Sequence, residues 1–365
     1  MSTANQDILI VGGGLIGMLT ARELARAGAR VRLLERGATG QESSWAGGGI
    51  ISPLYPWRYA EPVTALASWS QQHYSQLARE LYAESGIDPE LLPSGLLMLD
   101  VEDTDEALSW SRTHQHPIES LTSAGLRELE PGLAVGDSGL WMPEVTQIRN
   151  PRMAQAARMA LQTLGVVVEE HAEVTDLIVE SGVIRGVETV KGRYEAEQVV
   201  VASGAWSAEL LARLLVPVLV EPVKGQMILY SAEPEAIRHI VLQQGKYIIP
   251  RRDGHVLAGS TLEFVGFEKS TTADALAELR QAAEAMFPLL ADCEVVKQWA
   301  GLRPGTPSGI PYIGEHPQVR GLFLNAGHFR NGVVLGPASA RLMADLVLKR
   351  ATILAPGAYA LDSLH

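Results

Sequence analysis

Apolar and polar positions at the start of the chain follow two different periods. Residues 7–11 (DILIV) form a short apolar run that three glycines end. In residues 15–27 the apolar side chains recur at helical spacing, with Arg22, Glu23 and Arg26 on the outward face, and Gly28 stops the helix. Residues 30–34 (RVRLL) predict a second strand. The pattern therefore predicts a strand–helix–strand unit and an α/β fold with a doubly wound parallel sheet.

Three later stretches have other patterns of apolar and polar residues. Residues 166–201 carry β-branched runs separated by turn signals, which predicts a meander of short strands. Residues 225–260 alternate apolar and polar positions around further turns, and a helical pattern follows at 272–287. This block predicts a second, antiparallel α+β domain. The part from 301 onward is rich in glycine and proline and closes on a long apolar helix, predicted at 333–348.

Length, charge and cysteine usage narrow the functional class. With 365 residues the chain can bury two cores without disulfides or metals. The 30 Lys and Arg residues against 42 Asp and Glu give a formal net charge of -12, which would repel a nucleic-acid backbone. The single cysteine, Cys293, allows no internal disulfide and fits a reducing compartment, the cytoplasm.

Two segments bear on export and membrane insertion. The first residues, MSTANQD, lack a basic start and an apolar core, so we expect no signal peptide. The most apolar later stretch, 210–223, is interrupted by charged residues and prolines and falls short of the roughly 20 apolar residues that a membrane span needs. We expect a soluble protein with no membrane partner.

The glycines after the first strand have the spacing of a dinucleotide site. Gly12 allows a tight turn, Gly14 lets a pyrophosphate approach the backbone, and Gly17 lets the helix pack on the strand. Unpaired amides at the helix start would face the phosphates. Glu35 lies 18 positions beyond Gly17, near the spacing of about 20 at which an acid takes the ribose hydroxyls. This set predicts a dinucleotide with a free ribose, either NAD or FAD.

A second run of small residues bears on that choice. Residues 43–49 (SSWAGGG) come just after the strand–helix–strand unit, where compact residues would let the backbone pass against the phosphates and a flavin ring. A plain flexible loop is the alternative interpretation, because glycine and serine punctuate loops in any case. The run therefore favours FAD and leaves the loop interpretation open.

Seven motifs resemble those of one flavoprotein family. They run nearly from end to end: GGGLIG with Glu35, AGGGI, VVVASGAWS at 199–207, PVKGQ at 222–226, YIIPR at 247–251, WAGLRPGTPSGIPYIG at 299–314 and GHFRNGVVLGPAS at 327–339. With them the chain resembles the glycine oxidases of thiamine biosynthesis, within the D-amino acid oxidase and sarcosine oxidase group of flavoproteins. The last two motifs are the most specific.

The resemblance implies a substrate site with two arginines and a tyrosine. In the family WAGLRP supplies an arginine for the substrate carboxylate, here Arg303, and a guanidinium can hold both oxygens at once. Arg330 corresponds to a second substrate-side residue and Tyr247 to a tyrosine that hydrogen-bonds the carboxylate. Taken alone, these residues also fit a surface arginine, a solvated charge and a sheet tyrosine. We expect the glycines and the proline around Arg303 to shape a rigid turn.

The GHFRNG segment resembles the family's approach to the flavin. Helix amides and the positive end of the helix dipole would there stabilise the anionic reduced flavin, whereas a helix cap at His328 is the alternative. Besides Gly12, Gly14, Gly17 and Glu35, the resemblance implies cofactor contacts at Leu15, Ile16, Arg36, Ser43, Ser44, Gly48, Gly49, Ile50, Val174, Gly327, His328, Phe329, Arg330, Asn331, Gly332, Val333 and Val334.

Three features depart from the family pattern or are left open by it. Trp45 is large where the family has small residues, so the position of its loop relative to the adenine half of the cofactor is open. Residues 52–59 (SPLYPWRY) carry three aromatics and two prolines where the family places a lid, so the pocket size is open. Sarcosine oxidase relatives anchor the flavin on a cysteine, but Cys293 lies off that position. We predict non-covalent FAD.

The motifs also predict the domain division. A discontinuous FAD-binding domain of Rossmann type would comprise residues 1–90, 146–220 and 301–365, and a substrate-binding domain residues 91–145 and 221–300. Because family members tend to be tetramers, we expect a homo-oligomer.

Three functions are compatible with these residues. The one we favour is an oxidase that docks glycine, sarcosine or a small D-amino acid by its carboxylate for hydride transfer to the flavin. It would release the 2-oxo acid (glyoxylate), ammonia and, with O2, hydrogen peroxide, and feed thiamine thiazole synthesis. The nine histidines are scattered, and neither a metal site nor a Ser/His/Asp set is evident. The alternatives are a D-amino acid or N-methyl amino acid dehydrogenase that reduces a quinone, and a flavin module that serves a protein partner.

Overall fold

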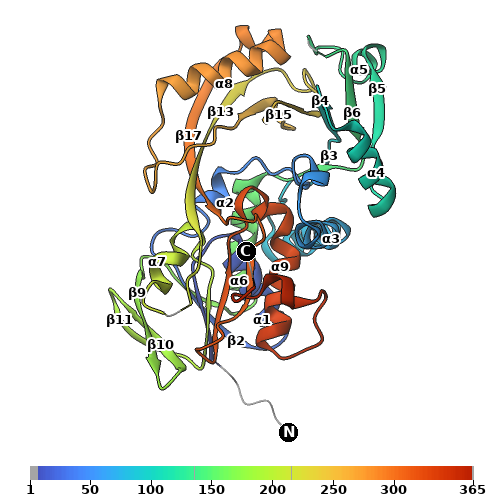
Figure 1. Ribbon diagram of the computed structural model, residues 1–365. Coiled ribbons are helices and arrows are strands. Elements are labelled where there is room, and N and C mark those ends of the chain that lie inside the picture. The colour runs from blue at the N-terminus through green and yellow to red at the C-terminus, as the bar shows by residue number, and fades with distance from the viewer. Residues whose placement is uncertain (1–6, 135, 215, 364–365) are drawn as a thin grey trace.

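Two large sheets, one in the lower and one in the upper part of Figure 1, organise the chain. The computed structural model describes residues 7–134, 136–214 and 216–363. Residues 1–6, on which most of the signal-peptide prediction falls, lie outside the described residues. Within the described part, no helix combines the length and the apolar character that crossing a membrane requires.

The lower sheet is built around the strand–helix–strand unit that the sequence predicts. Its six strands, in spatial order, are β18 (Tyr312–Glu315), β19 (Leu322–Ala326), β12 (Gln198–Val201), β1 (Asp7–Val11), β2 (Arg30–Leu34) and β8 (Val167–Glu169). All neighbours are parallel except β18, which is antiparallel to β19. The first helix ends at Arg26, and Gly28 follows with a φ of 87°. The predicted α/β fold with a parallel sheet is confirmed.

The two faces of this sheet are covered differently. Ile8 and Ile10 of β1 point to a core shared with four helices, whereas Leu9 and Val11 point to the opposite core. This alternation is the period of a strand whose two faces are both buried. The four helices are α1 (Leu15–Arg26), α3 (Glu61–Ser85), α6 (Asn150–Thr163) and α9 (Gly332–Val347). The opposite face packs on the three-stranded antiparallel sheet of β9 (Val174–Glu180), β10 (Val183–Thr189) and β11 (Gly192–Glu195).

The meander predicted for residues 166–201 is only partly right. β9, β10 and β11 form an antiparallel meander, but β8 and β12 at its two ends belong to the parallel sheet. All four residues of β12, QVVV, are buried. A run of valines fits a fully buried parallel strand as well as a meander strand, so the sequence pattern alone does not reveal the pairing.

The upper sheet has eight strands and carries one long helix on its outer face. In spatial order they are β17 (Glu294–Gly305), β13 (Glu221–Ser231), β16 (His255–Gly259), β15 (Lys246–Pro250), β14 (Ile240–Gln243), β4 (Leu96–Leu99), β6 (Ser138–Met142) and β5 (Glu119–Thr122). The predicted helix at 272–287 is α8 (Ala273–Met286), and the predicted C-terminal helix is α9. Residues of α8 pack with Ile248 and Ile228, so Tyr247 and Met227, one position away, face the other side of the sheet.

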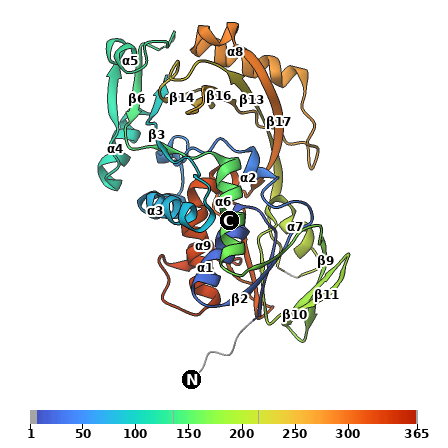
Figure 2. The same ribbon diagram turned by 180° about the vertical axis from the view of Figure 1, so that it is seen from behind.

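Two long strands connect the upper sheet to the lower part of the molecule. β13 and β17 pair over their whole length and curve downward, as both views show (Figures 1 and 2). The remaining elements are short or lie at the edges: α2 (Ser43–Ala46), α4 (Thr104–His114), α5 (Ser123–Leu129), α7 (Ser207–Leu211), β3 (Leu92–Pro93), β7 (Thr146–Gln147) and five 3-10 turns (Pro56–Arg58, Gly204–Trp206, Pro288–Asp292, Phe329–Asn331 and Pro356–Tyr359).

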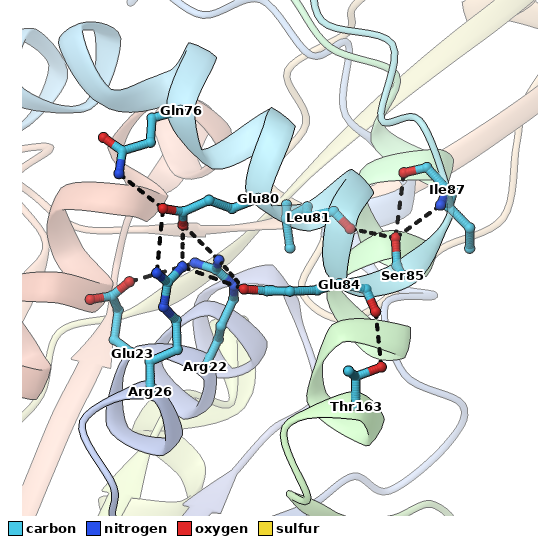
Figure 3. A network of polar contacts seen from close by, with 10 residues as sticks. All are labelled: Arg22, Glu23, Arg26, Gln76, Glu80, Leu81, Glu84, Ser85, Ile87 and Thr163. Carbon is cyan, nitrogen blue, oxygen red and sulfur yellow. Dashed lines mark hydrogen bonds and ion pairs between the residues drawn. The ribbon is translucent and has the colours of Figure 1, made fainter.

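A buried arginine fixes α1, which follows the glycine motif, against α3. The Arg22 side chain is 2% exposed; its Nε donates to Glu84 at 2.6 Å and its Nη2 to Glu80 at 2.7 Å (Figure 3). The sequence pattern placed Arg22 on the outward face of the helix, which is wrong. The helix is covered there by α3, and the two carboxylates offset the cost of burying the guanidinium.

Candidate active site

A cavity of about 500 Å³ lies between the start of α1 and the inner face of the upper sheet. It is lined by most of the predicted site residues: Gly12, Gly14, Leu15, Ile16, Glu35, Arg36, Ser43, Ser44, Gly48, Gly49, Ile50, Val174, Tyr247, Arg303, His328, Phe329, Arg330, Asn331, Gly332 and Val333. Three predicted residues lie outside the lining. Gly327, with a φ of 88°, packs against Thr306, where a Cβ would lie 2.5 Å from the Thr306 methyl group. Gly17 sits under Gly12, where a Cβ would be 2.0 Å from the Gly12 oxygen, and Val334 is buried in the helical core.

One end of the cavity has the geometry of a dinucleotide site. Gly12 has a φ of 112°, which disfavours any side chain, and a Cβ there would lie 2.5 Å from the Ala202 oxygen. The Glu35 carboxylate accepts hydrogen bonds from the amides of Gly13 at 2.7 Å and Gly37 at 2.8 Å. Two amides thus fix this acid at the cavity wall, in the position from which it would meet a ribose.

The SSWAGGG run forms one helical turn, α2, followed by an extended Gly47 and by Gly49 with a φ of 80°. Ser44 Oγ accepts from the Leu15 amide at 2.7 Å, which ties the run to the start of α1. Trp45 does not line the cavity; its ring packs edge-on against Trp299 at 5.4 Å, with Lys297 over it at 4.3 Å. The large side chain therefore points away from the cavity, and the small residues remain at the wall.

A buried arginine that the sequence reasoning left unassigned holds the next part of this loop. Arg251, the last residue of YIIPR, donates to Gln147 Oε1 at 2.6 Å, to the Ile148 oxygen at 3.2 Å and to the Gly48 oxygen at 2.7 Å. Burial lowers the pKa of its guanidinium to about 10. Arg251 thus links the upper sheet to Gly48, which lines the cavity.

Arg303 lies inside a strand, contrary to the rigid turn expected from its glycine and proline neighbours. In β17 it pairs with Val223 of β13, and the pairing continues through Pro304 and Gly305. Because β17 is the edge strand of the upper sheet, Pro304 can occupy it without breaking a ladder on both sides. The strand fixes the direction of the Arg303 side chain more firmly than a turn would.

The guanidinium of Arg303 is held by neutral oxygens only. It donates to Ser260 Oγ at 2.8 Å, to the Thr261 oxygen at 3.2 Å and to the Lys224 oxygen at 3.4 Å. Burial, together with the nearby charge of Arg330, lowers the pKa of Arg303. Gly225 leaves the room for the group, because a Cβ there would lie 2.1 Å from the guanidinium.

Tyr247 reaches the same cavity from β15. The residue is 7% exposed, its hydroxyl donates to Met227 Sδ at 3.7 Å, and a Cβ on Gly48 would lie 3.5 Å from the hydroxyl oxygen. The phenol is close enough to Arg303 to oppose part of the fall in the arginine's pKa. A tyrosine hydroxyl and a guanidinium thus face one space beside the glycine loop.

The GHFRNG segment brings a second arginine and two buried polar groups to the cavity. Among the described residues, Arg330 makes no hydrogen bond or ion pair, although it lines the cavity. His328 Nε2 contacts Ser339 Oγ at 2.9 Å, and burial lowers the pKa of the imidazole to about 3, so the ring is neutral. Asn331 Nδ2 is buried with no hydrogen-bond partner among the described residues, as expected of a donor that awaits a ligand.

The segment 52–59 is bound to Asp103, at the start of α4, rather than lying free. Trp57 Nε1 donates to Asp103 at 2.7 Å, and Arg58 makes a two-pronged contact with the same carboxylate at 2.6 Å. Hydrogen bonds from Arg58 lower the pKa of Asp103 to about 2, so the contact persists at neutral pH. Leu54, in the same segment, lines the cavity.

Several cavity residues were not assigned from the sequence. Ser260 holds Arg303, Gly225 makes room for it, and Met227 supports Tyr247, yet none of the three carries an obvious chemical signal alone. Gly225 does lie in the PVKGQ motif, which could have directed attention to it. Trp206, in VVVASGAWS, also lines the cavity. Gly225, Met227 and Ser260, which directly follows β16, come together through the pairing of β13 with β16 and β17, which a single sequence does not display.

The class of the protein follows from this fold, this cavity and a family comparison. The model of the family described as FAD dependent oxidoreductase matches residues 7–346, so the chain belongs to that family and uses FAD. It is 49% identical, over 98% of both chains, to glycine oxidase from Pseudomonas aeruginosa. The solved glycine oxidase from Geobacillus kaustophilus superposes with a TM-score of 0.94 at 33% identity, covering 99% of this chain and all of that one. A 32% identical relative, the bifunctional protein ThiO/ThiG of Trichormus variabilis, is matched over 94% of this chain and 53% of its own length.

The cavity residues fit FAD. The cavity has three features that the two ends of this cofactor require. They are glycines at which a Cβ does not fit, an acid held at the ribose position, and an unpaired buried side-chain amide at the start of α9. Glu35 and Gly12 would hold the nucleotide half, and the Gly48 loop with Asn331 the flavin half. No group of three or more potential metal ligands occurs among the described residues.

Proposed function

We propose that this FAD enzyme oxidises glycine and similar small amines, such as sarcosine or small D-amino acids, to the 2-oxo acid and ammonia, or methylamine in the case of sarcosine. One observation carries the proposal: Arg303 and Arg330 face a single cavity, and neither has an ion-pair partner among the described residues. Two such cations favour an anionic ligand, and a planar guanidinium suits a carboxylate. The glycine oxidase names of the most similar relatives support glycine as the substrate.

The chain's own residues would act by orientation and charge. Arg303, held by Ser260, Thr261 and Lys224 oxygens, would grip the carboxylate, and Tyr247 would donate to it. With the carboxylate fixed, the Cα–H bond of the amine faces the cofactor in one orientation. Less entropy is then lost when the reacting atoms align. When bound, FAD supplies the hydride acceptor. His328, neutral through burial, adds no further cation to a site that already has two.

The electron acceptor that we propose is O2, which is reduced to hydrogen peroxide. Water then hydrolyses the imine product to glyoxylate and ammonia. The enzyme would supply oxidised glycine for the synthesis of the thiazole part of thiamine, and the ThiO/ThiG name of one relative supports this role. We propose a cytoplasmic homo-oligomer, a tetramer, and a division into the FAD and substrate domains given by the motifs; light scattering of the purified protein tests the tetramer.

Anaerobic mixing of the purified protein with a panel of small amines tests the activity. We expect glycine to bleach the flavin absorbance fastest, and air to restore it with one peroxide per turnover. No bleaching by glycine, sarcosine or D-alanine would refute the proposal. Bleaching by D-alanine or sarcosine with slow reoxidation in air, and fast reoxidation by a quinone, would instead favour a dehydrogenase.

A further inference from the structure

A buried guanidinium next to the Gly48 loop has no charged partner. Arg251 directly follows β15 and is 7% exposed. Its side chain donates to neutral oxygens only, those of Gln147 Oε1 at 2.6 Å, the Ile148 backbone at 3.2 Å and the Gly48 backbone at 2.7 Å. Neither the glycine motif nor the proposed substrate contacts give this cation a role.

The acids nearest to Arg251 are already paired with another arginine. The carboxylates of Glu90 and Asp253 lie 3.3 and 2.7 Å from Arg149 Nη1. Burial and the charge of Arg149 lower the pKa of Arg251, the two acids oppose them, and the value of about 10 leaves the group charged at pH 7. A buried charge without a counter-ion destabilises a fold, so its presence points to a functional role.

The Gly48 oxygen belongs to a peptide unit whose amide side is free. Because the C=O and N–H groups of a trans peptide point in opposite directions, the Gly49 N–H points away from Arg251. Gly49 is buried, yet its amide has no hydrogen-bond partner among the described residues. Gly48 and Gly49 line the cavity, whereas Arg251 does not. Buried amides are nearly always paired, so this N–H is a donor left for the cofactor.

A cation at a carbonyl oxygen polarises the peptide and makes its N–H a stronger donor. We propose that Arg251 is a positioning residue for the flavin. Acting through the Gly48–Gly49 peptide, its charge strengthens the hydrogen bond from the Gly49 amide to the ring and stabilises the flavin in its anionic, reduced form. Arg303 and Arg330 line the cavity and serve the substrate in the proposed function, whereas Arg251 acts on the cofactor from behind the loop.

Sulfite, which adds to oxidised flavin to give an anionic adduct, tests this role in the holoenzyme. Arg251→Gln keeps a donor for the Gly48 oxygen but removes the charge. We expect the dissociation constant of sulfite to rise about tenfold, the effect of a unit charge about 10 Å away at the effective dielectric constant of a protein. The reduction potential of bound FAD should fall by about 30 mV, the two-electron equivalent of that factor. The matched control is Arg252→Gln, because Arg252 is 58% exposed and pairs with Asp88 at the surface; it should match the wild type.

Two further variants separate the charge of Arg251 from its packing. Arg251→Lys keeps the charge without the fork, so its sulfite affinity should lie nearer to the wild type than that of Arg251→Gln. Gln147→Glu leaves the arginine in place and sets a carboxylate against its Nη1, so it should weaken sulfite binding as Arg251→Gln does.

Three results would overturn the proposal. They are wild-type sulfite affinity and potential in Arg251→Gln, equal losses in Arg251→Lys and Arg251→Gln, and wild-type values in Gln147→Glu. Equal losses in the first pair would mean that Arg251 only holds the loop. Both measurements use FAD and no amine, so a failure here leaves the proposed substrate untouched, and a failure with glycine leaves the role of Arg251 untouched.

Discussion

At the scale of single residues, the site depends on an arginine whose charge is not neutralised. Among the described residues Arg303 has only neutral acceptors, and Arg330 adds a second positive charge to the same cavity. Burial and this repulsion already lower the pKa of Arg303. A substrate carboxylate would remove the repulsion and satisfy the guanidinium at once, so the site should prefer acids over simple amines.

Removing the guanidinium should abolish carboxylate binding. For Arg303→Met we expect kcat/KM for glycine to fall at least about hundredfold, because two charge-assisted hydrogen bonds are lost. Arg303→Lys should recover only part of the loss, since an ammonium keeps the charge but not the fork. Anaerobic flavin reduction over a glycine series measures both. The exposed Arg213, changed to Met, is the control, and a wild-type kcat/KM for Arg303→Met would contradict the proposed role.

At the scale of elements, the sequence pattern predicted the helices and strands whose buried side chains recur with a single period along the chain. β1, α1, β2, α8 and α9 lie within about a residue of their predicted bounds because each shows one apolar stripe or run. The turn expected at Arg303 and the outward position of Arg22 were wrong. Both depend on a partner distant in sequence: β13 pairs with the strand of Arg303, and α3 covers Arg22.

The same limit applies to the site. The glycine motif and Glu35 were predictable because one strand–turn–helix unit carries them. Ser260 and Gly225 were not, since their relation to Arg303 arises from the register of three strands. Arg303, Arg330 and Tyr247 came from the family resemblance, and their catalytic roles stay predictions.

The pairing of β13 with β17 offers a test of the Arg303 position that leaves the cofactor alone. In Gly225→Ala the new Cβ would lie 2.1 Å from the guanidinium, and the flexible arginine is the group that must move. We expect the variant to fold and bind FAD, with KM for glycine raised at least about tenfold, a loss of about 1.4 kcal/mol. Gly357→Ala, where a Cβ meets nothing within 4 Å, should behave as the wild type. An unchanged KM would show that Arg303 does not need this gap.

The clamp between α1 and α3 should make stability depend on pH. Burial raises the pKa of Glu80, but hydrogen bonds from Arg22, Gln76 and Arg26 outweigh it and hold that pKa at about 2, below the ordinary value of 4.5. The unfolded chain therefore binds the proton more readily, so this stabilisation is complete above pH 4.5 and is lost as the pH falls toward 2.

Arg22→Met should weaken the clamp and flatten this pH dependence. We expect the free energy of unfolding at pH 7 to fall by about 3 kcal/mol, because a buried charge pair is broken. Thermal melts of the apoprotein between pH 7 and pH 3 measure both effects, with Met in place of the exposed Arg79 of α3 as the control. If the variant and the wild type lose stability in parallel below pH 4.5, Arg22 is not what lowers the pKa of Glu80.

At the scale of the whole molecule, the cavity and the only cysteine lie at opposite ends of one strand. Cys293 precedes the first residue of β17, and Arg303 lies near the last, so roughly 30 Å of strand separates them. The thiol packs with the core under α8, where its Sγ donates to the Leu289 oxygen at 3.4 Å, and burial raises its pKa. A thiol that is remote from the cavity and held protonated is a poor nucleophile toward a flavin.

The cofactor should therefore come away when the fold is lost. After precipitation with acid we expect a yellow supernatant and a colourless pellet, because the cavity supplies only non-covalent contacts to FAD. Cys293→Ser should retain the same flavin content per chain as the wild type, measured by absorbance before precipitation. A yellow pellet that turns colourless in Cys293→Ser would identify a covalent link and contradict the separation of the thiol from the cavity. A yellow pellet in both would point to another attachment residue, for which the cavity-lining His328 is the first to test, by His328→Asn.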